Sequence, residues 1–598
     1  MSFLFYKSNA KEHLTCSHRE ISSPGLCQEC ENDVLTRRKY RWLLIFCLVW
    51  PYALQALDST IIASALFWIA KDFGEISQQN WIISTFNLTS AAFIPFWAQI
   101  ADVFGRHIAL SSSILLMILG SGLCTAAPTN VYGVMLLGRA FQGISASGLN
   151  VLTRTVLADR VSLEESAKSW AIFSIVGGFS YGLGPVIGGM FQFLHTPSGA
   201  NCFKTGYLTK VNWRWCFAIN LPIAVFGLFI VFILLRKHLL GPQQLPELDE
   251  TAVPGRRNKF LVRLQTIDFG GQILFVAGSG LVILGLTWGG AAYPWDSAAV
   301  ITSLAIGSLL LVVFVLWERL LEPGRYLANR LPKQKPMIPW SLISTKDMGL
   351  LFYIECATGI SMFSVLYFCN AFFVRVKNYQ ADKAGLQLLC FVPGLGVGVY
   401  MCTFLCNRWP RMTYPPLFLG TILETFGVAF LALAMHNGHP PTIFGLMALA
   451  GIGMGLKFMV APLHGIGLFK THRATVLALI GIAVPFGGTL GLTIMSTVFN
   501  NTAGLDVENS GDYSEDTTSQ VQHGIVYGYV SIIPFMALSC IACLFMGTVI
   551  LGKESPENGQ KTEDAVIHEP YLWYLLRGQN KQCDNKRIAM NSLFQSQP

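Results

Sequence analysis

The feature that most limits how this chain can fold is a succession of apolar stretches, each long enough to cross a lipid bilayer. A helix of about 20 residues spans the roughly 30 Å of bilayer hydrocarbon. Fourteen stretches of this length are centred near Val49, Ala91, Leu116, Asn150, Gly178, Ile223, Val276, Gly307, Met362, Gly394, Phe426, Gly451, Gly487 and Met536. With 52% hydrophobic and only 13% charged residues, the chain does not have the composition of a soluble globular protein. The sequence therefore predicts an all-α integral membrane protein with fourteen spans.

The net charge of +8 follows the membrane and is not gathered on one polar domain, so we expect no nucleic-acid partner. If the spans alternate, most loop lysines and arginines fall on one side, which the positive-inside rule makes cytoplasmic. They flank the first, sixth, seventh, eighth and tenth spans: Arg37, Arg38, Lys39, Arg41, Arg236, Lys237, Arg256, Arg257, Lys259, Arg263, Arg319, Arg325, Arg330, Lys333, Lys335, Arg408 and Arg411. Both termini are then expected in the cytoplasm. The loop with Arg375, Lys377 and Lys383 fits the rule poorly.

The fifteen cysteines do not indicate a disulfide framework, because most of them lie within predicted spans. The N-terminal tail is polar and carries five cysteines and histidines: His13, Cys16, His18, Cys27 and Cys30. Their spacing matches no standard zinc finger, so we expect a disordered, reduced tail and no metal, with zinc binding as the alternative. Asn500 begins a glycosylation acceptor, Asn-Asn-Thr, at an expected outer loop.

The stretch GGFSYGLGPVIGG, residues 177–189, is the most glycine-rich part of an expected span. On a helix its glycines form two adjoining strips: Gly178, Gly182 and Gly189 on one, and Gly177, Gly184 and Gly188 on the other. Small residues let a neighbouring helix approach the backbone closely, and Pro185 is expected to bend the segment. Without further information, a close-packing helix of any multi-span protein explains this pattern equally well.

Two ionisable residues stand inside early spans. Asp58 lies in the first span, where a charge is costly unless it faces a cavity or a partner. It is either a protonatable site or an acid that caps the outer end of the helix. Arg139 lies in the fourth span, about one turn from Gln142 and Gly143. It cannot release a proton, but it can stabilise a nearby carboxylate; alternatively, its side chain extends to the cytoplasmic interface.

A short loop between the second and third spans contains Asp102, Gly105 and Arg106. The acid and the arginine are held near neighbouring helix ends, where they can pair and lock one conformation. Alternatively, they form a solvated surface pair worth at most about 1 kcal/mol.

Three further ionisable residues lie inside later spans: Glu355, Glu424 and Lys457. Each costs about 3 kcal/mol at the bilayer centre unless it is paired, so we expect them to line a wet central cavity. Lys457 is expected to neutralise one of the two glutamates. Structural pairing and substrate recognition both remain open. Trp213, Arg214 and Trp215 are expected to anchor the start of the sixth span at the headgroup level.

Taken in order, these motifs resemble those of the major facilitator superfamily, in its fourteen-span drug:proton antiporter branch. The likeness covers residues 42–552. It lies in LDSTIIASAL around Asp58, the loop with Asp102, the run from Arg139 to Gly143, the glycine-rich stretch, Trp-Arg-Trp before Asn220, and TIDFGG before the seventh span. Ala98 and His107 depart from the loop signature, which usually has a glycine and a basic residue there.

The resemblance implies a major facilitator fold of two six-helix halves with two extra central helices. The expected division is a tail at 1–41, a first half at 42–236, a linker at 237–267, the extra pair at 268–318, a loop at 319–346, a second half at 347–552 and a tail at 553–598. It also implies that Asp58 and Arg139 take part in proton coupling, that Asp102, Gly105 and Arg106 form a conformational clamp, and that the glycine-rich helix accompanies antiport.

The function expected from this resemblance is proton-coupled export of small organic compounds such as drugs, mycotoxins or other secondary metabolites. We expect a monomer in the plasma membrane, or else the vacuolar membrane, with protons and an organic substrate as partners and no cofactor. The alternatives are an importer of iron chelates or amino acids and a non-transporting sensor. An intramembrane enzyme is a weaker alternative, because the spans show no Ser/His/Asp or metal-ligand cluster.

Overall fold

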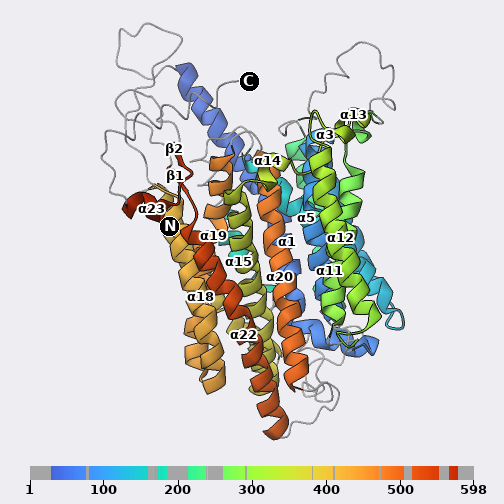
Figure 1. The fold of residues 1–598 in the computed structure, drawn as a ribbon, viewed down its shortest axis with the longest axis vertical. Coiled ribbons are helices and arrows are strands. Elements are labelled where there is room, and N and C mark those ends of the chain that lie inside the picture. The colour runs from blue at the N-terminus through green and yellow to red at the C-terminus, as the bar shows by residue number, and fades with distance from the viewer. Residues whose placement is uncertain are drawn as a thin grey trace.

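In the computed structural model, the described residues are 28–75, 80–158, 213–236, 260, 262–289, 293–379, 381–407, 411–469, 473–503, 515–550 and 565–576, together with 169, 172, 173, 175–181, 183, 184, 187, 239 and 241. They form a bundle of long helices that run roughly side by side, with one short strand pair near one end (Figure 1). All fourteen predicted span centres lie in helical residues.

The N-terminal half consists of α1 (Gln28–Phe73), α2 (Asn80–Ala92), α3 (Ile94–Phe104), α4 (Arg106–Ala126), α5 (Tyr132–Ala158), α7 (Arg214–Ala218), α8 (Asn220–Ile230) and the π-helical turn η4 (Val231–Leu235). The break between α2 and α3 falls at Phe93, just before Pro95 in the first turn of α3. A proline has no backbone N–H to donate, so it is tolerated in a first turn but interrupts a continuous helix. Helix α5 packs against α2 and α4 and lies at the centre of this half.

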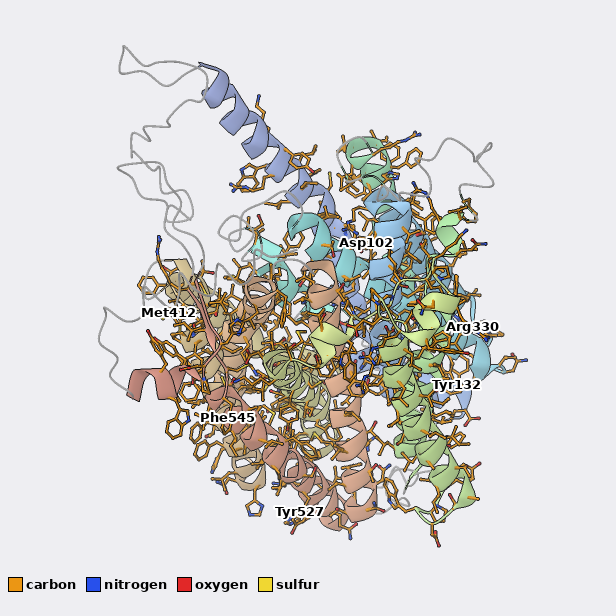
Figure 2. The ribbon with its side chains drawn as sticks, turned by 45° about the horizontal axis from the view of Figure 1, so that its top comes forward. Asp102, Tyr132, Arg330, Met412, Tyr527 and Phe545 are labelled. Carbon is orange, nitrogen blue, oxygen red and sulfur yellow. The ribbon has the colours of Figure 1, made fainter. Side chains whose placement is uncertain are left out.

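The C-terminal half consists of α15 (Lys346–Ala371), η5 (Phe372–Val376), α16 (Ala381–Leu388), α17 (Phe391–Asn407), α18 (Tyr414–Asn437), α19 (Pro440–Leu468), α20 (Arg473–Ala503) and α22 (Glu515–Leu544). Here α19 packs against α17 and α18, while α20 packs against α15 and α22. Figure 2 shows the halves beside each other, with Asp102 and Tyr132 on one and Met412, Tyr527 and Phe545 on the other.

Between the halves in sequence lie α11 (Phe269–Trp288) and α12 (Ala298–Leu320), which form an antiparallel pair, followed by the short α13 (Tyr326–Arg330) and α14 (Trp340–Ile343). Asp268 caps α11 by accepting from Gly271 N at 2.9 Å, and the Trp317 indole of α12 donates to the same oxygen at 3.0 Å. Burial raises the pKa of Asp268, and these two hydrogen bonds oppose the shift. Because α11 also packs against α2 and α20, the pair contacts both halves.

Eleven helices within the described residues are long and apolar enough to cross a membrane. The three predicted spans outside this set are the broken pair α2 and α3, the helix α5, and the stretch around Gly178, which is described only in part. Helix α5 is less apolar because it carries Arg139, Asn150 and Arg154. The structure thus confirms a helical membrane protein, and the number of fourteen spans stays a prediction.

Two segments differ from the expected polar tails. Helix α1 begins at Gln28, inside the segment expected to be a disordered tail, and projects beyond the bundle (Figure 1). At the other end of the chain, β1 (Thr548–Ile550) pairs antiparallel with β2 (Ala565–Ile567), and α23 (Tyr571–Leu576) follows. The Tyr571 ring lies 5.0 Å from the ring of Tyr414 in α18, so this part of the tail packs against the bundle.

Glycine-mediated packing between α17 and α19 gives a direct test of the fold. A methyl group at Gly394 would collide with the carbonyl oxygen of Ala448 in α19, whereas at Gly396 it would meet nothing within 4 Å. We expect Gly394→Val to destabilise the protein by about 1–3 kcal/mol through overpacking, and Gly396→Val to change its stability by less than about 0.5 kcal/mol. Thermal unfolding of both purified variants checks this; equal midpoints would contradict the observed packing.

Candidate functional site

The candidate site is built around Asp58, a residue of α1 with no exposed surface. Its carboxylate accepts a hydrogen bond from Arg139 Nη1 at 3.0 Å and another from Gln142 Nε2 at 2.9 Å. The side-chain amide of Asn220 in α8 also donates to it. Two charges can be buried together only when further hydrogen bonds satisfy their remaining atoms. The structure therefore brings Asp58 and Arg139 together as a fully enclosed ion pair.

Further contacts hold Arg139 and Gln142 in place. Arg139 Nη1 donates to Gln142 Oε1 at 2.8 Å, and its Nε donates to the Ile82 carbonyl of α2 at 3.2 Å. The guanidinium carbon lies 4.2 Å from the centroid of the Phe86 ring, a cation–π contact. Gln142 Nε2 also donates to Ser121 Oγ of α4 at 2.9 Å. Because five helices contribute to this network, a change of charge on Asp58 affects how they pack.

Glycines allow α4 and α5 to come close enough for these bonds. A methyl group at Gly120 of α4 would lie 2.7 Å from Gln142 N and 2.8 Å from Gly138 O of α5. A methyl group at Gly138 would lie 2.9 Å from Cys124 N. Real side chains do not approach so closely, so larger residues would push α5 away. The short Gln142–Ser121 contact depends on this packing.

The two glycine strips predicted in residues 177–189 contact different helices. A methyl group at Gly184 would collide with Thr60 Oγ1 and lie 2.9 Å from Ile61 N, beside Asp58 in α1. A methyl group at Gly178 would collide with the Leu395 side chain of α17, in the other half. The remaining predicted positions of this motif lie outside the described residues: Gly182, Pro185, Gly188 and Gly189.

Two contacts at different depths join the halves, and the first of them lies beside this network. The Tyr367 hydroxyl of α15 donates to the carbonyl of Ser59, the residue after Asp58, at 3.0 Å. Arg154 of α5 is buried, and its guanidinium carbon lies 5.8 Å from the centroid of the Phe458 ring in α19. Because Arg154 lies fifteen residues beyond Arg139 on α5, the second contact is about 22 Å further along this helix, so the halves touch at both depths.

The C-terminal half holds a second cluster of buried charges. Lys457 of α19 forms an ion pair with Glu424 of α18, and neither side chain has exposed surface. Glu355 of α15 is within electrostatic range of Lys457 and Arg154. Within the described part of the chain, Glu355 Oε1 has no hydrogen-bond partner. Lys457 therefore neutralises Glu424, one of the two expected partners, while Glu355 faces the boundary with Arg154.

The expected clamp residues lie at the turn from α3 to α4. Arg106 Nη1 donates to Asp102 Oδ1 at 2.6 Å, with 10% of the arginine and 42% of the aspartate side chain exposed. Gly105 has a φ of 95°, a backbone conformation that other residues rarely adopt, so glycine is needed for this turn. Arg263, from the segment before α11, donates to Val103 O at 2.6 Å. The pair forms as expected, and its role as a clamp stays a prediction.

Sequence reasoning missed two site residues. Asn220 was expected only within a helix anchor, yet its amide donates to Asp58; the signal was a polar side chain inside a strongly apolar span. Arg154 had the same signal, a charge in an expected span.

The residues expected to anchor the start of the sixth span make contacts with the rest of the protein. The Trp213 indole donates to Asp72 at 2.8 Å, and Arg214 donates to Ala127 O at 2.8 Å.

Two other predicted features remain untested. Asn500 lies in the last turns of α20, and its glycosylation stays a prediction. Most of the possible zinc ligands in the N-terminal tail lie outside the described residues: His13, Cys16, His18 and Cys27. Cys30 lies in the first turn of α1.

The enclosed ion pair predicts a specific pattern of stability. Arg139→Met should leave an uncompensated buried carboxylate and destabilise the protein by about 3–5 kcal/mol. Adding Asp58→Asn removes that charge, so the double variant should be more stable than Arg139→Met alone. Thermal unfolding of the two purified variants and the parent protein measures the difference. A double variant no more stable than Arg139→Met would show that the two residues do not interact as described.

Comparison with known proteins agrees with this architecture. The family model described as Major Facilitator Superfamily matches residues 49–492. Among solved structures, the proton:xylose symporter XylE superimposes with a TM-score of 0.53 at 14% identity, covering 84% of this chain and 95% of that one. A bacterial homologue of the human lysosomal transporter Spinster gives a TM-score of 0.52 at 14% identity, with 84% and 96% covered. At such low identity these two likenesses show the fold alone.

Three curated relatives from fungi match most of the chain. The efflux pump FUS6 of Gibberella fujikuroi is 28% identical over 464 residues, which cover 77% of this chain and 75% of that protein. MFS transporter L2 of a Phoma species is 27% identical over 494 residues, covering 80% and 74%. The MFS-type efflux pump LUC4 of a Fusarium species is 27% identical over 503 residues, covering 83% and 80%. The family indicated by the sequence motifs is thus confirmed, and the chain belongs to the major facilitator superfamily of membrane transporters.

Proposed function

We propose that this protein is a proton-coupled antiporter that exports small, mostly apolar organic compounds, such as drugs, mycotoxins or other secondary metabolites. The observation that carries the proposal is the enclosed carboxylate of Asp58, bonded to Arg139, Gln142 and Asn220. An ionisable residue at membrane depth is costly to maintain, and such residues mark ion or substrate pathways in transporters. A carboxylate with a movable cationic partner can exchange that partner for a proton.

The network suggests how a proton would act. With a proton on Asp58, the ion pair loses its negative member, while Arg139 keeps Gln142 Oε1, the Ile82 carbonyl and the Phe86 ring as partners. The arginine is therefore still satisfied when Asp58 is neutral. Because Ser59 accepts from Tyr367 of the opposite half, a shift of α1 on protonation would weaken a contact between the halves. Alternating access requires this kind of coupling between charge and the position of the halves.

Four buried polar residues, drawn from both halves, suit a substrate-binding role. Gln142, Glu355, Glu424 and Lys457 all lie in the core, and Glu355 Oε1 lacks a hydrogen-bond partner within the described residues. A substrate group that donates a hydrogen bond would satisfy this oxygen. The aromatic rings of Phe363 and Tyr367, stacked 6.2 Å apart, offer an apolar surface two to three turns further along the same helix. This combination favours a largely apolar substrate with few polar groups.

The direction of transport rests on two arguments. The glycine-rich segment contacts both α1 and α17, which suits a helix that follows the motion of one half against the other. The names of FUS6 and LUC4 describe those proteins as efflux pumps.

We also propose that the protein works as a monomer in the plasma membrane, where export removes a compound from the cell. In this proposal, Asp102 and Arg106 hold one of its conformations.

A susceptibility screen tests the function without knowing the substrate. Expression of the full-length protein in a yeast strain that lacks its own drug exporters should protect the cells from some members of a panel of toxic compounds. Net uptake of a radiolabelled form of a compound from which the protein protects the cells should fall in expressing cells. Increased uptake would instead indicate an importer and contradict the proposed direction.

The proton-coupling role of Asp58 predicts loss of driven transport in Asp58→Asn. In proteoliposomes with an imposed pH gradient, accumulation of the compound found in the screen should fall to the level of protein-free vesicles, because asparagine cannot exchange a proton. Asp72→Asn is the matched control, since Asp72 lies on the same helix, is exposed, and accepts only from the Trp213 indole among the bonds described. This control should retain driven accumulation.

Two results would contradict the coupling mechanism. Undiminished gradient-driven accumulation in Asp58→Asn would remove Asp58 from it. Equal loss in the Asp72→Asn control would show that the effect comes from damage to α1 and not from the missing carboxylate.

A further inference from the structure

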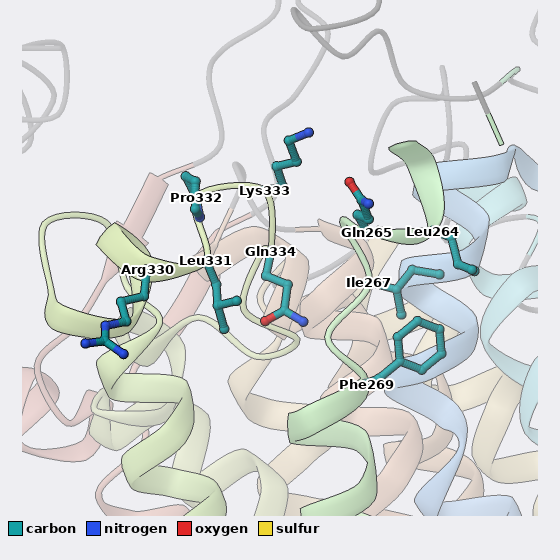
Figure 3. A pocket seen from close by; sticks show the side chains of 9 residues that line it. All are labelled: Leu264, Gln265, Ile267, Phe269, Arg330, Leu331, Pro332, Lys333 and Gln334. Atoms are coloured by element: carbon teal, nitrogen blue, oxygen red, sulfur yellow. The ribbon is translucent and has the colours of Figure 1, made fainter. Parts of the chain in front are cut away.

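A cavity outside the proposed transport site lies where the segment before α11 meets the loop after α13. It has a volume of about 330 Å³ and is lined mainly by apolar side chains (Figure 3). Ile267 and Phe269 form one wall, while Leu331 and Gln334 extend toward them from the opposite loop. Nothing in the transport mechanism uses this cavity.

The two walls are connected, so their separation is a fixed feature of the fold. The Lys335 N–H donates to the Thr266 carbonyl at 3.3 Å, which joins the walls directly. Gln99 of α3 bridges them as well: its Nε2 donates to Lys335 O at 3.1 Å, and its Oε1 accepts from Asp268 N at 3.2 Å. The cavity is therefore bounded on both sides by segments that are attached to the N-terminal half.

The rim of this cavity is strongly basic. Residues 319–339 contain five arginines and lysines but only one acid, Glu322, which pairs with Arg325 at 3.6 Å. Arg330 and Lys333 line the rim and are exposed, and both side chains point outward from the cavity in Figure 3. An anionic group at the rim would meet two cationic side chains and no carboxylate among the lining residues.

The interior of the cavity provides an apolar surface and one acceptor. Gln334 Oε1 is buried and, in the part of the chain that the structure describes, has no hydrogen-bond partner. From Phe269, an apolar strip continues along α11 to Ile273 one turn further, with 40% and 67% of these side chains exposed. Exposed apolar residues on a membrane-spanning helix face lipid chains. The cavity thus opens where the basic rim meets the lipid-facing surface.

We propose that this cavity binds an anionic phospholipid, with the phosphate at the basic rim that carries Arg330 and Lys333 and an acyl chain along Phe269 and Ile273. A headgroup hydroxyl or ammonium donates to Gln334 Oε1. Basic pockets beside membrane helices bind anionic headgroups, because the attraction acts at the level of the negatively charged lipid surface. The side on which the basic loops are expected is the cytoplasmic one, where anionic lipids are abundant.

The same site connects the lipid to α3. Gln99, which bridges the two walls, lies three residues before Asp102 on α3. A lipid that fills the cavity would hold both walls, and hence Gln99, in the arrangement seen here. Anionic lipid should therefore raise the thermal stability of the purified protein, and the gain should be smaller in Gln99→Leu, which removes the bridge.

The test uses native mass spectrometry of the full-length protein with phosphatidylinositol, phosphatidylserine or phosphatidylcholine. We expect the two anionic lipids to be retained in preference to phosphatidylcholine. Each basic side chain near the membrane surface contributes about fivefold to anionic lipid binding, so Arg330→Gln with Lys333→Gln should weaken retention by about 25-fold. The matched control, Arg236→Gln with Lys346→Gln, makes the same charge change at two exposed positions that lie outside the rim and do not line the cavity, and it should have little effect.

A second variant separates the cavity from the charges. Leu331→Trp fills the cavity and leaves Arg330 and Lys333 in place, so it should also reduce retention of phosphatidylinositol. Normal retention in Leu331→Trp, an equal loss in the control pair, or no preference for anionic lipids would each overturn the proposal. Complete displacement of the lipid by soluble inositol phosphate would overturn it too, because the site would then recognise a free phosphate compound. The proposal does not depend on the proposed transport function.

Discussion

The ion pair between Asp58 and Arg139 is the interaction on which the rest of the N-terminal half depends. Removing both charges from water costs several kcal/mol for each, and the protein recovers this only where geometry and additional hydrogen bonds are good. Those bonds come from Gln142 and Asn220, from a backbone carbonyl of α2, and from Ser121 behind Gln142. Each of these donors and acceptors comes from a different helix. The helices α1, α2, α4, α5 and α8 therefore have to lie in one specific arrangement to satisfy the pair.

The C-terminal half solves the same problem in a more local way. Glu424 and Lys457 neutralise one another across two neighbouring helices, and small residues make the contact possible: a methyl group at Gly453 would lie 2.7 Å from Glu424 Cβ. Glu355 differs because its nearest opposite charges come from Lys457 and from Arg154 of the other half. The Glu424–Lys457 pair thus lies entirely within one half. Glu355 and Arg154 interact across the boundary, where their environment depends on how the halves are positioned.

The sequence predicted those features that follow from composition, motif order and the cost of buried charge. Helical spans, the pairing of Asp102 with Arg106, and the neutralisation of a glutamate by Lys457 belong to this group, because each rests on nearby residues or on a charge that needs a partner. The bond from Asn220 to Asp58 and the contact of Arg154 with Phe458 were not predictable in this way. They join residues far apart in the chain, and periodicity contains no information on which helices become neighbours. The strand pair that includes Thr548–Ile550 was missed, because a strand of three residues is too short to show the alternation of apolar and polar residues.

The glycine-rich segment contacts both halves of the protein. Gly184 packs against Thr60 and Ile61, immediately after Asp58 and Ser59, while Gly178 packs against Leu395 of the opposite half. At Gly184 the contact atoms include the main chain of Thr60 and Ile61, so this packing cannot adjust by rotation of side chains alone, whereas Gly178 meets the side chain of Leu395. If the halves move apart at α17, this segment has to separate from α17 or shift against α1. A shift would alter the packing beside Asp58, so the same close contact that stabilises the bundle also makes the enclosed carboxylate sensitive to the position of the other half.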